Sequence, residues 1–137
     1  MSRVLLDTSA YAGYMRNHPQ LQAPMRSASA VHLNAIVVGE LLAGFKKGSR
    51  AKQNEYRLRE FISEPRVTVL NVDEETAVWY AAIKDYLRRE GTPIPTNDVW
   101  IAATASQHGL RLQTLDAHFL RVPQIIVDFF EPIAHAK

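Results

Sequence analysis

The chain has 137 residues, which suits one domain and leaves little room for a second. Apolar residues make up 47% of it and charged residues 22%, a balance typical of a folded globular protein, and the absence of cysteine excludes a disulfide framework and a thiolate metal site. Lys and Arg number 16 against 14 Asp and Glu, so the net charge of +2 does not by itself point to a class of partner.

Short apolar runs alternate with longer stretches of helical periodicity along the chain. In chain order, the runs that predict strands are 4–6, 31–34, 67–70, 110–114 and 125–127. The stretches that predict helices are about 8–16, 19–24, 36–45, 50–62, 74–89 and 98–108. Strands separated by helices favour a parallel sheet, so we expect an α/β fold, a three-layer α/β/α sandwich with four or five mostly parallel strands. Neither a repeat nor a linker interrupts the pattern, which predicts a single domain over residues 1–137.

Capping residues and glycines mark the predicted helix ends. Candidate caps at helix starts are Thr8 or Ser9, Ser49, Asp73 or Glu74, and Thr96 or Asn97. Candidate stop signals are Lys46, Lys47 and Gly48 after the third helix, Gly91 after the fifth and Gly109 after the sixth. Two prolines, at positions 19 and 24, bracket the second helix.

Two aspartates directly follow predicted strands. Asp7 ends the first apolar run, and Asp116 comes just after the strand that ends at Thr114. Ligands of an open α/β sheet bind beyond the carboxyl ends of the strands, so both acids are candidates for a binding site. Aspartate is also common at such places as a turn or cap residue, and this simpler explanation stays open for both.

Glu40 stands out because it is the only ionisable residue between Ile36 and Phe45. If it faces inward, an unpaired carboxylate there would cost several kcal/mol unless a cation or a proton neutralised it. The helix is apolar nearly all round, so a narrow exposed strip is the alternative for Glu40.

Asp98 lies in the first turn of its predicted helix, where the helix dipole favours a negative charge. Thr96 and Asn97 precede it as better cap candidates, so the helix does not need Asp98 for capping. Three apolar residues, among them Ile101, share its face, which suggests that this face meets the sheet. An acid at the inner edge of a core helix is unusual and favours a functional role.

If Asp7, Glu40, Asp98 and Asp116 meet at one edge of the sheet, they raise one another's pKa or recruit a cation. Oxygen ligands select hard ions, so we expect Mg²⁺ or Mn²⁺, whereas the histidines at 18, 32, 108, 118 and 135 are scattered and lack the spacing of a zinc site. Without these four acids, 16 positive charges face 10 negative ones, a balance of +6. Such a surface suits a polyanionic partner, although charge alone favours the simpler explanation of an ordinary mixed surface.

Four segments in this order resemble the motifs of the PIN-domain nucleases, and among them the VapC-like toxins of bacterial toxin–antitoxin pairs. They are VLLDTS at 4–9, VGELLAG at 38–44, PTNDVWIAA at 95–103 and LQTLDAHF at 112–119. The resemblance runs nearly end to end, and although one motif alone would be weak, the four together are fairly specific. It implies a PIN-like fold and the hydrolysis of RNA phosphodiester bonds with the help of one or two divalent ions.

The resemblance also implies roles for individual residues. Asp7, Asp98 and Asp116 would be direct or water-mediated metal ligands, and Glu40 a further ligand or the residue that orients the attacking water. Supporting polar groups are Thr8, Ser9, Asn97 and Thr114. Leu115 departs from the pattern, because many members of the family have a polar residue at this position.

Similar proteins pair as homodimers and are inhibited by a small antitoxin laid across the acidic pocket, so the resemblance implies both partners here. Arg16, Lys46 and Lys47 are candidates for contacts to the RNA backbone, although a solvated helix face explains the two lysines as well. The first apolar run is too short for a signal peptide, and no apolar stretch approaches the length of a membrane span. We therefore expect a cytoplasmic protein without membrane contact.

Two other classes of function remain as alternatives. A phosphoacceptor signalling domain also places carboxylates around Mg²⁺ at strand ends, but it needs adjacent acids after the first strand and a lysine after the last. Here Thr8 and Ser9 follow Asp7, and none of the five lysines follows the strand that ends at Thr114. A non-catalytic binding module, in which the acids serve only as caps and turns, predicts that divalent ions do not change the stability of the protein.

Overall fold

A computed structural model of the chain describes residues 2–133. Within them lie the strands β1 (Arg3–Leu6), β2 (Ala30–Asn34), β3 (Val67–Leu70), β4 (Arg111–Thr114) and β5 (Val127–Phe129). The helices are α1 (Thr8–Met15), α2 (Pro19–Ser27), α3 (Ala35–Lys46), α4 (Ala51–Ile62), α5 (Glu74–Glu90) and α6 (Thr96–His108), with a 3₁₀ helix η1 (Ala117–Arg121). The last histidine of the sequence, His135, lies outside the described residues.

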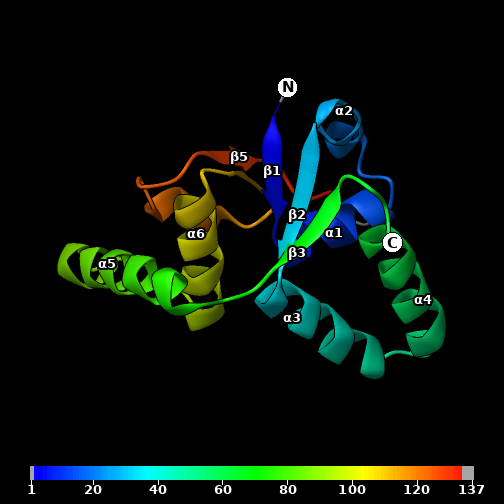
Figure 1. The fold of residues 1–137 in the computed structure, drawn as a ribbon, viewed down its shortest axis with the longest axis horizontal. Helices are drawn as coiled ribbons and strands as arrows, with labels where there is room; N and C mark the ends of the chain where they lie inside the picture. Colours follow the sequence, from blue (N-terminus) through cyan, green and yellow to red (C-terminus); the bar gives the residue numbers. More distant parts are fainter. Residues whose placement is uncertain (1, 134–137) are drawn as a thin grey trace.

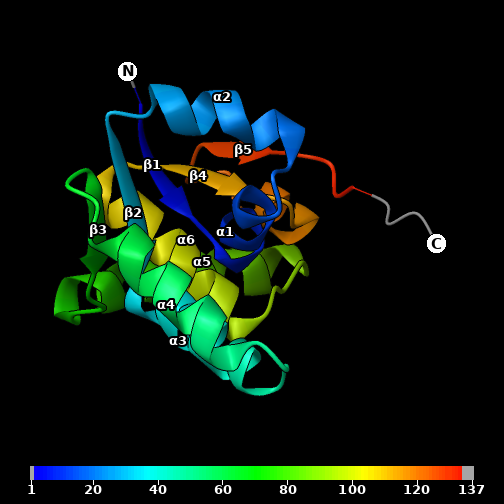
Figure 2. The same cartoon turned by 90° about the vertical axis from the view of Figure 1, so that its right-hand side faces the viewer.

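The five strands form one sheet in the order β3-β2-β1-β4-β5, and every neighbouring pair is parallel. In Figure 1 the sheet lies between α5 and α6 on one side and α1, α2 and α4 on the other, and Figure 2 shows the latter group in front of the sheet. The three-layer α/β/α sandwich with a parallel sheet is therefore confirmed. That one domain spans all of 1–137 stays a prediction.

The centre of the sheet is apolar on both faces. The β1 residues Val4, Leu5 and Leu6 are buried, and Leu5 pairs in register with Leu112 of β4. Helix α6 covers one face with a buried run, Ile101–Ala105, whose small side chains allow close packing. This packing places the amino end of α6, with Asp98, near the point where β1 and β4 end, which brings Asp98 to the same edge as Asp7 and Asp116.

Several helix ends differ from the sequence-based prediction. Asp7, and not Thr8 or Ser9, is the N-cap of α1, because its carboxylate accepts the backbone N–H of Ala10 at 2.8 Å. Helix α4 begins after Arg50 and α6 after Pro95, and neither start has a side-chain cap. The predicted caps Ser49, Thr96 and Asn97 were therefore wrong, although Asp73 does cap α5.

Two boundaries were also wrong. Pro24 does not end α2 but lies inside it, since the buried side chains of Leu21 and Met25 hold the helix together despite the backbone hydrogen bond that a proline removes. The last strand covers Val127–Phe129, two residues later than its apolar run predicts, because pairing with β4 sets its position. No helix among residues 2–133 is both long and apolar enough to cross a membrane.

Candidate active site

Asp7 lies at the carboxyl end of β1 with 4% of its surface exposed. Its carboxylate accepts hydrogen bonds from the hydroxyls of Ser9 at 2.8 Å and Thr114 at 2.6 Å, besides the N–H of Ala10. Burial raises the pKa of Asp7, while these hydrogen bonds oppose the rise and the charge of Asp116 adds to it. The hydroxyls of Thr114 and Ser9 thus hold the first acid in place.

Asp98 lies in the first turn of α6 with a mostly buried side chain. Burial, followed by the negative charges of Asp116, Asp7 and Glu40 in that order, raises its pKa to about 6. His118 acts in the opposite direction. The charges of all three other acids therefore act on Asp98.

Asp116 follows β4 and is the N-cap of η1. Its carboxylate accepts the backbone N–H of His118 at 2.9 Å, and its own backbone N–H donates to the hydroxyl of Thr114 at 2.9 Å. The apolar Leu115 does not disturb this turn, because its backbone N–H donates to the hydroxyl of Ser9 at 2.9 Å. The first and fourth acids are therefore joined through the hydroxyl of Thr114, while the hydroxyl of Ser9 joins Asp7 to the backbone of Leu115.

Glu40 is half-buried on α3 and makes hydrogen bonds at both carboxylate oxygens. The hydroxyl of Thr8 donates to Oε1 at 2.6 Å, and the side-chain amide of Asn97 donates to Oε2 at 3.2 Å. Glu40 thus lies on a partly open face and its charge is neither isolated nor fully buried. Thr8 and Asn97, which do not cap helices, hold the second acid in place between α1 and α6.

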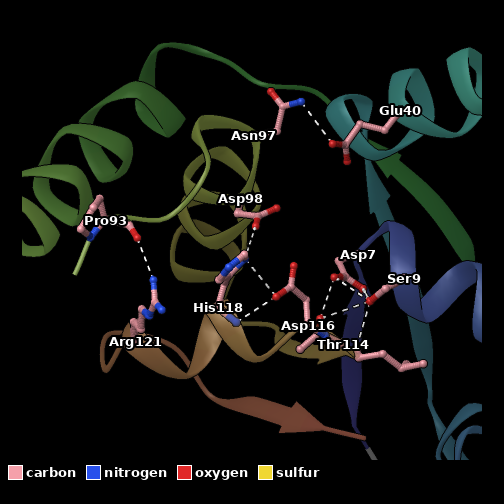
Figure 3. A network of polar contacts seen from close by, with 11 residues as sticks. Asp7, Ser9, Glu40, Pro93, Asn97, Asp98, Thr114, Asp116, His118 and Arg121 are labelled. Atoms are coloured by element: carbon pink, nitrogen blue, oxygen red, sulfur yellow. Dashed lines mark hydrogen bonds and ion pairs between the residues drawn. The ribbon is translucent and has the colours of Figure 1, made fainter. Parts of the chain in front are cut away.

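Figure 3 shows the four acids around one region at the carboxyl edge of the sheet, contributed by β1, α3, α6 and the turn after β4. The structure therefore brings together every acid that the sequence singled out. An open hollow of about 350 Å³ adjoins this region and is lined by Glu40, Asn97 and apolar residues of α3. One side of the acid cluster is thus accessible to a ligand.

His118 was not among the residues predicted from the sequence, because its spacing is that of a scattered histidine. Figure 3 shows its ring between two acids, and Nδ1 lies 3.1 Å from Oδ1 of Asp116 and 3.6 Å from Oδ2 of Asp98. The spacing rules for metal sites require several histidines at fixed intervals, so they do not detect one histidine that stands alone. The available signal was its place two residues after a candidate acid.

The donor set suits a divalent cation. One ligand atom each from Asp98, Asp116 and His118 lies within 4.8 Å of the others, and Nδ1 of His118 is buried without a hydrogen-bond partner among the residues described. Asp7 and Glu40 add negative charge beside this group, as their effect on the pKa of Asp98 shows. A metal ion bound here would neutralise the carboxylates and would give the unpaired nitrogen a partner.

The proposed RNA contacts lie on exposed surface. Lys46 and Lys47 are exposed at the end of α3, and Arg16 is exposed at the end of α1. Arg16 also borders a small hollow of about 150 Å³ between α1, α3 and α4, together with Tyr11 and Arg57. These positions are compatible with contacts to a polyanion, and the contacts themselves stay a prediction.

Comparison with known proteins assigns the family. The model of the PIN domain matches residues 4–125. Ribonuclease VapC4 of Mycobacterium tuberculosis is 31% identical over 127 residues, which cover 91% of this chain and 95% of the relative. The tRNA(fMet)-specific endonuclease VapC of Salmonella typhimurium is 29% identical over 131 residues, covering 93% and 98%.

Solved structures agree with this assignment. The DNA-bound VapBC structure from Salmonella typhimurium matches with a TM-score of 0.82 at 29% identity, over 94% of this chain and 98% of that one. FitAcB from Neisseria gonorrhoeae matches with a TM-score of 0.73 at 32% identity, over 93% and 96%. The chain belongs to the PIN-domain family.

Proposed function

We propose that the chain is a Mg²⁺- or Mn²⁺-dependent endoribonuclease and the toxin of a toxin–antitoxin pair. The observation that carries this proposal is the convergence of four carboxylates from distant segments, with the pKa of Asp98 raised to about 6 by burial and by the other three. The similarity to VapC ribonucleases supports the same reaction.

Each acid has a distinct environment, which suggests a division of roles. Asp98 and Asp116 present oxygens towards a common point and are the principal metal ligands in this proposal. Asp7 supplies negative charge and is fixed by its hydrogen bonds to Ser9 and Thr114. When bound, one or two divalent ions supply charge for the scissile phosphate and activate a water molecule.

The role of Glu40 follows from its position. Both of its oxygens accept hydrogen bonds, from Thr8 and Asn97, and its side chain lines the open hollow. A carboxylate held in this way can accept a proton from water at the edge of the site without changing its own position. We therefore assign Glu40 the orientation of the attacking water, with direct binding of an ion as the second choice.

The partners are part of the same proposal. Structures of relatives are VapBC toxin–antitoxin complexes, which supports a small antitoxin as a partner of this chain. We further propose RNA as the substrate, with Arg16, Lys46 and Lys47 as contacts to its backbone. A homodimer and a cytoplasmic location complete the proposal.

Cleavage of RNA by the purified chain, without antitoxin, tests the activity. Wild type should cut single-stranded RNA with Mg²⁺ or Mn²⁺ and stop cutting with EDTA, whereas Asp116→Asn should be inactive. Asp85→Asn, which changes an exposed acid of α5 outside the site, should cut like wild type. Equal cleavage by wild type and Asp116→Asn would show that the activity belongs to a contaminant.

The same preparations separate the main alternatives. A phosphoacceptor domain would incorporate phosphate from acetyl phosphate on an aspartate and would leave RNA intact. A non-catalytic module would do neither and would bind divalent ions no better than Asp116→Asn does.

A further inference from the structure

His118 is placed by the turn that follows β4. It lies two residues after Asp116 in η1, and this 3₁₀ turn directs the imidazole back towards the amino end of α6. Nδ1 lies 3.1 Å from Oδ1 of Asp116 and 3.6 Å from Oδ2 of Asp98, so the ring lies between the two acids. The other side of the side chain is open, with 43% of its surface exposed.

The contact is not an ordinary hydrogen bond. Nδ1 is buried yet has no hydrogen-bond partner within residues 2–133, although a carboxylate oxygen lies 3.1 Å away. The same oxygen of Asp116 already accepts the backbone N–H of His118 at 2.9 Å. Nδ1 thus lies close to the carboxylates of Asp116 and Asp98 without a hydrogen bond to either. Three ligand atoms around one metal ion have this arrangement.

From this geometry we propose that Nδ1 of His118 is a ligand of the divalent ion, together with the carboxylates of Asp98 and Asp116. The proposal deepens the proposed function, because it concerns the ion of the same site. Oxygen ligands alone suit Mg²⁺, whereas an imidazole nitrogen raises the affinity for Mn²⁺ more than for Mg²⁺. The site should therefore favour Mn²⁺.

Binding of Mn²⁺ to the full chain, prepared without a polyhistidine tag, tests this without any RNA. Electron spin echo spectra of bound Mn²⁺ should show modulation from one imidazole nitrogen. His118→Gln keeps a hydrogen-bond donor beside the acids but has no imidazole, so the modulation should disappear. His108→Gln, which changes a half-buried histidine at the far end of α6, should retain it.

Titration provides the second measurement. In His118→Gln the dissociation constant of Mn²⁺ should rise about tenfold and that of Mg²⁺ by less than about twofold, because only the softer ion gains from nitrogen. Equal weakening of both ions by a folded His118→Gln would overturn the proposal. A wild-type spectrum without nitrogen modulation would overturn it as well, even if His118→Gln failed to fold. If the protein cleaves RNA but its spectrum shows no nitrogen coupling, only the proposal that His118 is a ligand is refuted. If the spectrum shows nitrogen coupling but the protein does not cleave RNA, only the proposed ribonuclease activity is refuted.

Discussion

At the scale of the residue, Asp7 has a structural and a chemical role at once. It caps α1 through the N–H of Ala10, and it also faces Asp116 closely enough for the two charges to interact. The cap interpretation of this residue is therefore confirmed, and its functional interpretation stays a prediction. A buried acid that satisfies local hydrogen bonds can still contribute its charge to a site.

Replacing Asp7 separates these two roles. Asparagine is as good an N-cap as aspartate, so Asp7→Asn should keep its melting temperature within a few degrees while cleavage of RNA falls on the order of a hundredfold or more. Asp73→Asn is the matched control, because Asp73 caps α5 in the same way but lies outside the site. Cleavage rates and thermal melts of both variants check this. Retained activity in Asp7→Asn would count against the assignment.

The raised pKa of Asp98 predicts how stability depends on pH when no metal is present. The folded-state pKa of about 6 exceeds the ordinary value of 3.8, so the folded protein binds this proton more tightly than the unfolded chain. The stabilising contribution is complete below about pH 4 and is lost as the pH rises to about 6. It should amount to something on the order of 1–3 kcal/mol.

The variant Asp98→Asn tests the predicted direction of this change in stability with pH. With EDTA present, wild type should lose free energy of unfolding between pH 4 and 6 relative to the variant, and the variant should be the more stable protein at pH 7, because it removes a repelled charge. Denaturant unfolding at several pH values measures the difference. Parallel pH profiles would show that Asp98 is not perturbed in the folded state.

The acids of the candidate site, the hydroxyls beside them and the amide of Asn97 could be named from the sequence, whereas His118 was missed. Strand ends and an isolated charge in an apolar helix are local patterns, so Asp7, Glu40 and their neighbours could be found in the sequence. For His118 the local signal was weak, since it was only its place two residues after Asp116, and its contact with Asp98 depends on the direction of one ring across the gap to α6. The spacing of residues along the sequence does not show which side chains from distant segments come into contact in the fold.

At the scale of the element, the position of Glu40 depends on three helices. Thr8 of α1 and Asn97 of α6 each hold one oxygen of this acid on α3. The amino ends of α1 and α6 thus act as a clamp on the second acid. Small movements between these helices would change the distance of Glu40 from Asp98.

Thr8→Val tests the clamp. Valine keeps the shape of threonine but removes the donor to Oε1, so Glu40 should lose its fixed orientation and the catalytic rate should fall about tenfold, equivalent to roughly one hydrogen bond. The KM for RNA should change much less. Thr68→Val, on the exposed side of β3, is the control and should cut like wild type. A rise in KM without a fall in rate would assign Thr8 to substrate binding instead.

Strand and helix identities could be predicted, but their ends could not. Apolar runs and helical periodicity are averages over many residues, and they predicted all five strands of the sheet. An end depends on one hydrogen bond, as at Asp7, or on packing from outside, as for Pro24 inside α2. Two expected caps, Thr96 and Asn97, stand instead inside α6, where Asn97 binds Glu40.

At the scale of the whole molecule, folding itself assembles the acid cluster. Its members come from positions 7 to 116, so they are close only when β1, β4, α3 and α6 are all in place. The parallel sheet explains the convergence, since its strands all end at one edge. The unfolded chain has no such cluster, and an ion that binds the cluster must bind the folded state preferentially.

Divalent ions should therefore stabilise the protein against unfolding. At a free concentration one hundred times the dissociation constant, the free energy of unfolding should rise by about 2.7 kcal/mol, because binding is linked to folding. Thermal melts with Mn²⁺, Mg²⁺ and EDTA measure this, and the stabilisation should grow with the logarithm of the ion concentration. Asp98→Asn should lose most of it, whereas Asp85→Asn, outside the cluster, should keep it. If wild type and Asp98→Asn gained equally, the ion would be acting elsewhere on the surface and the cluster would be a set of caps and turns.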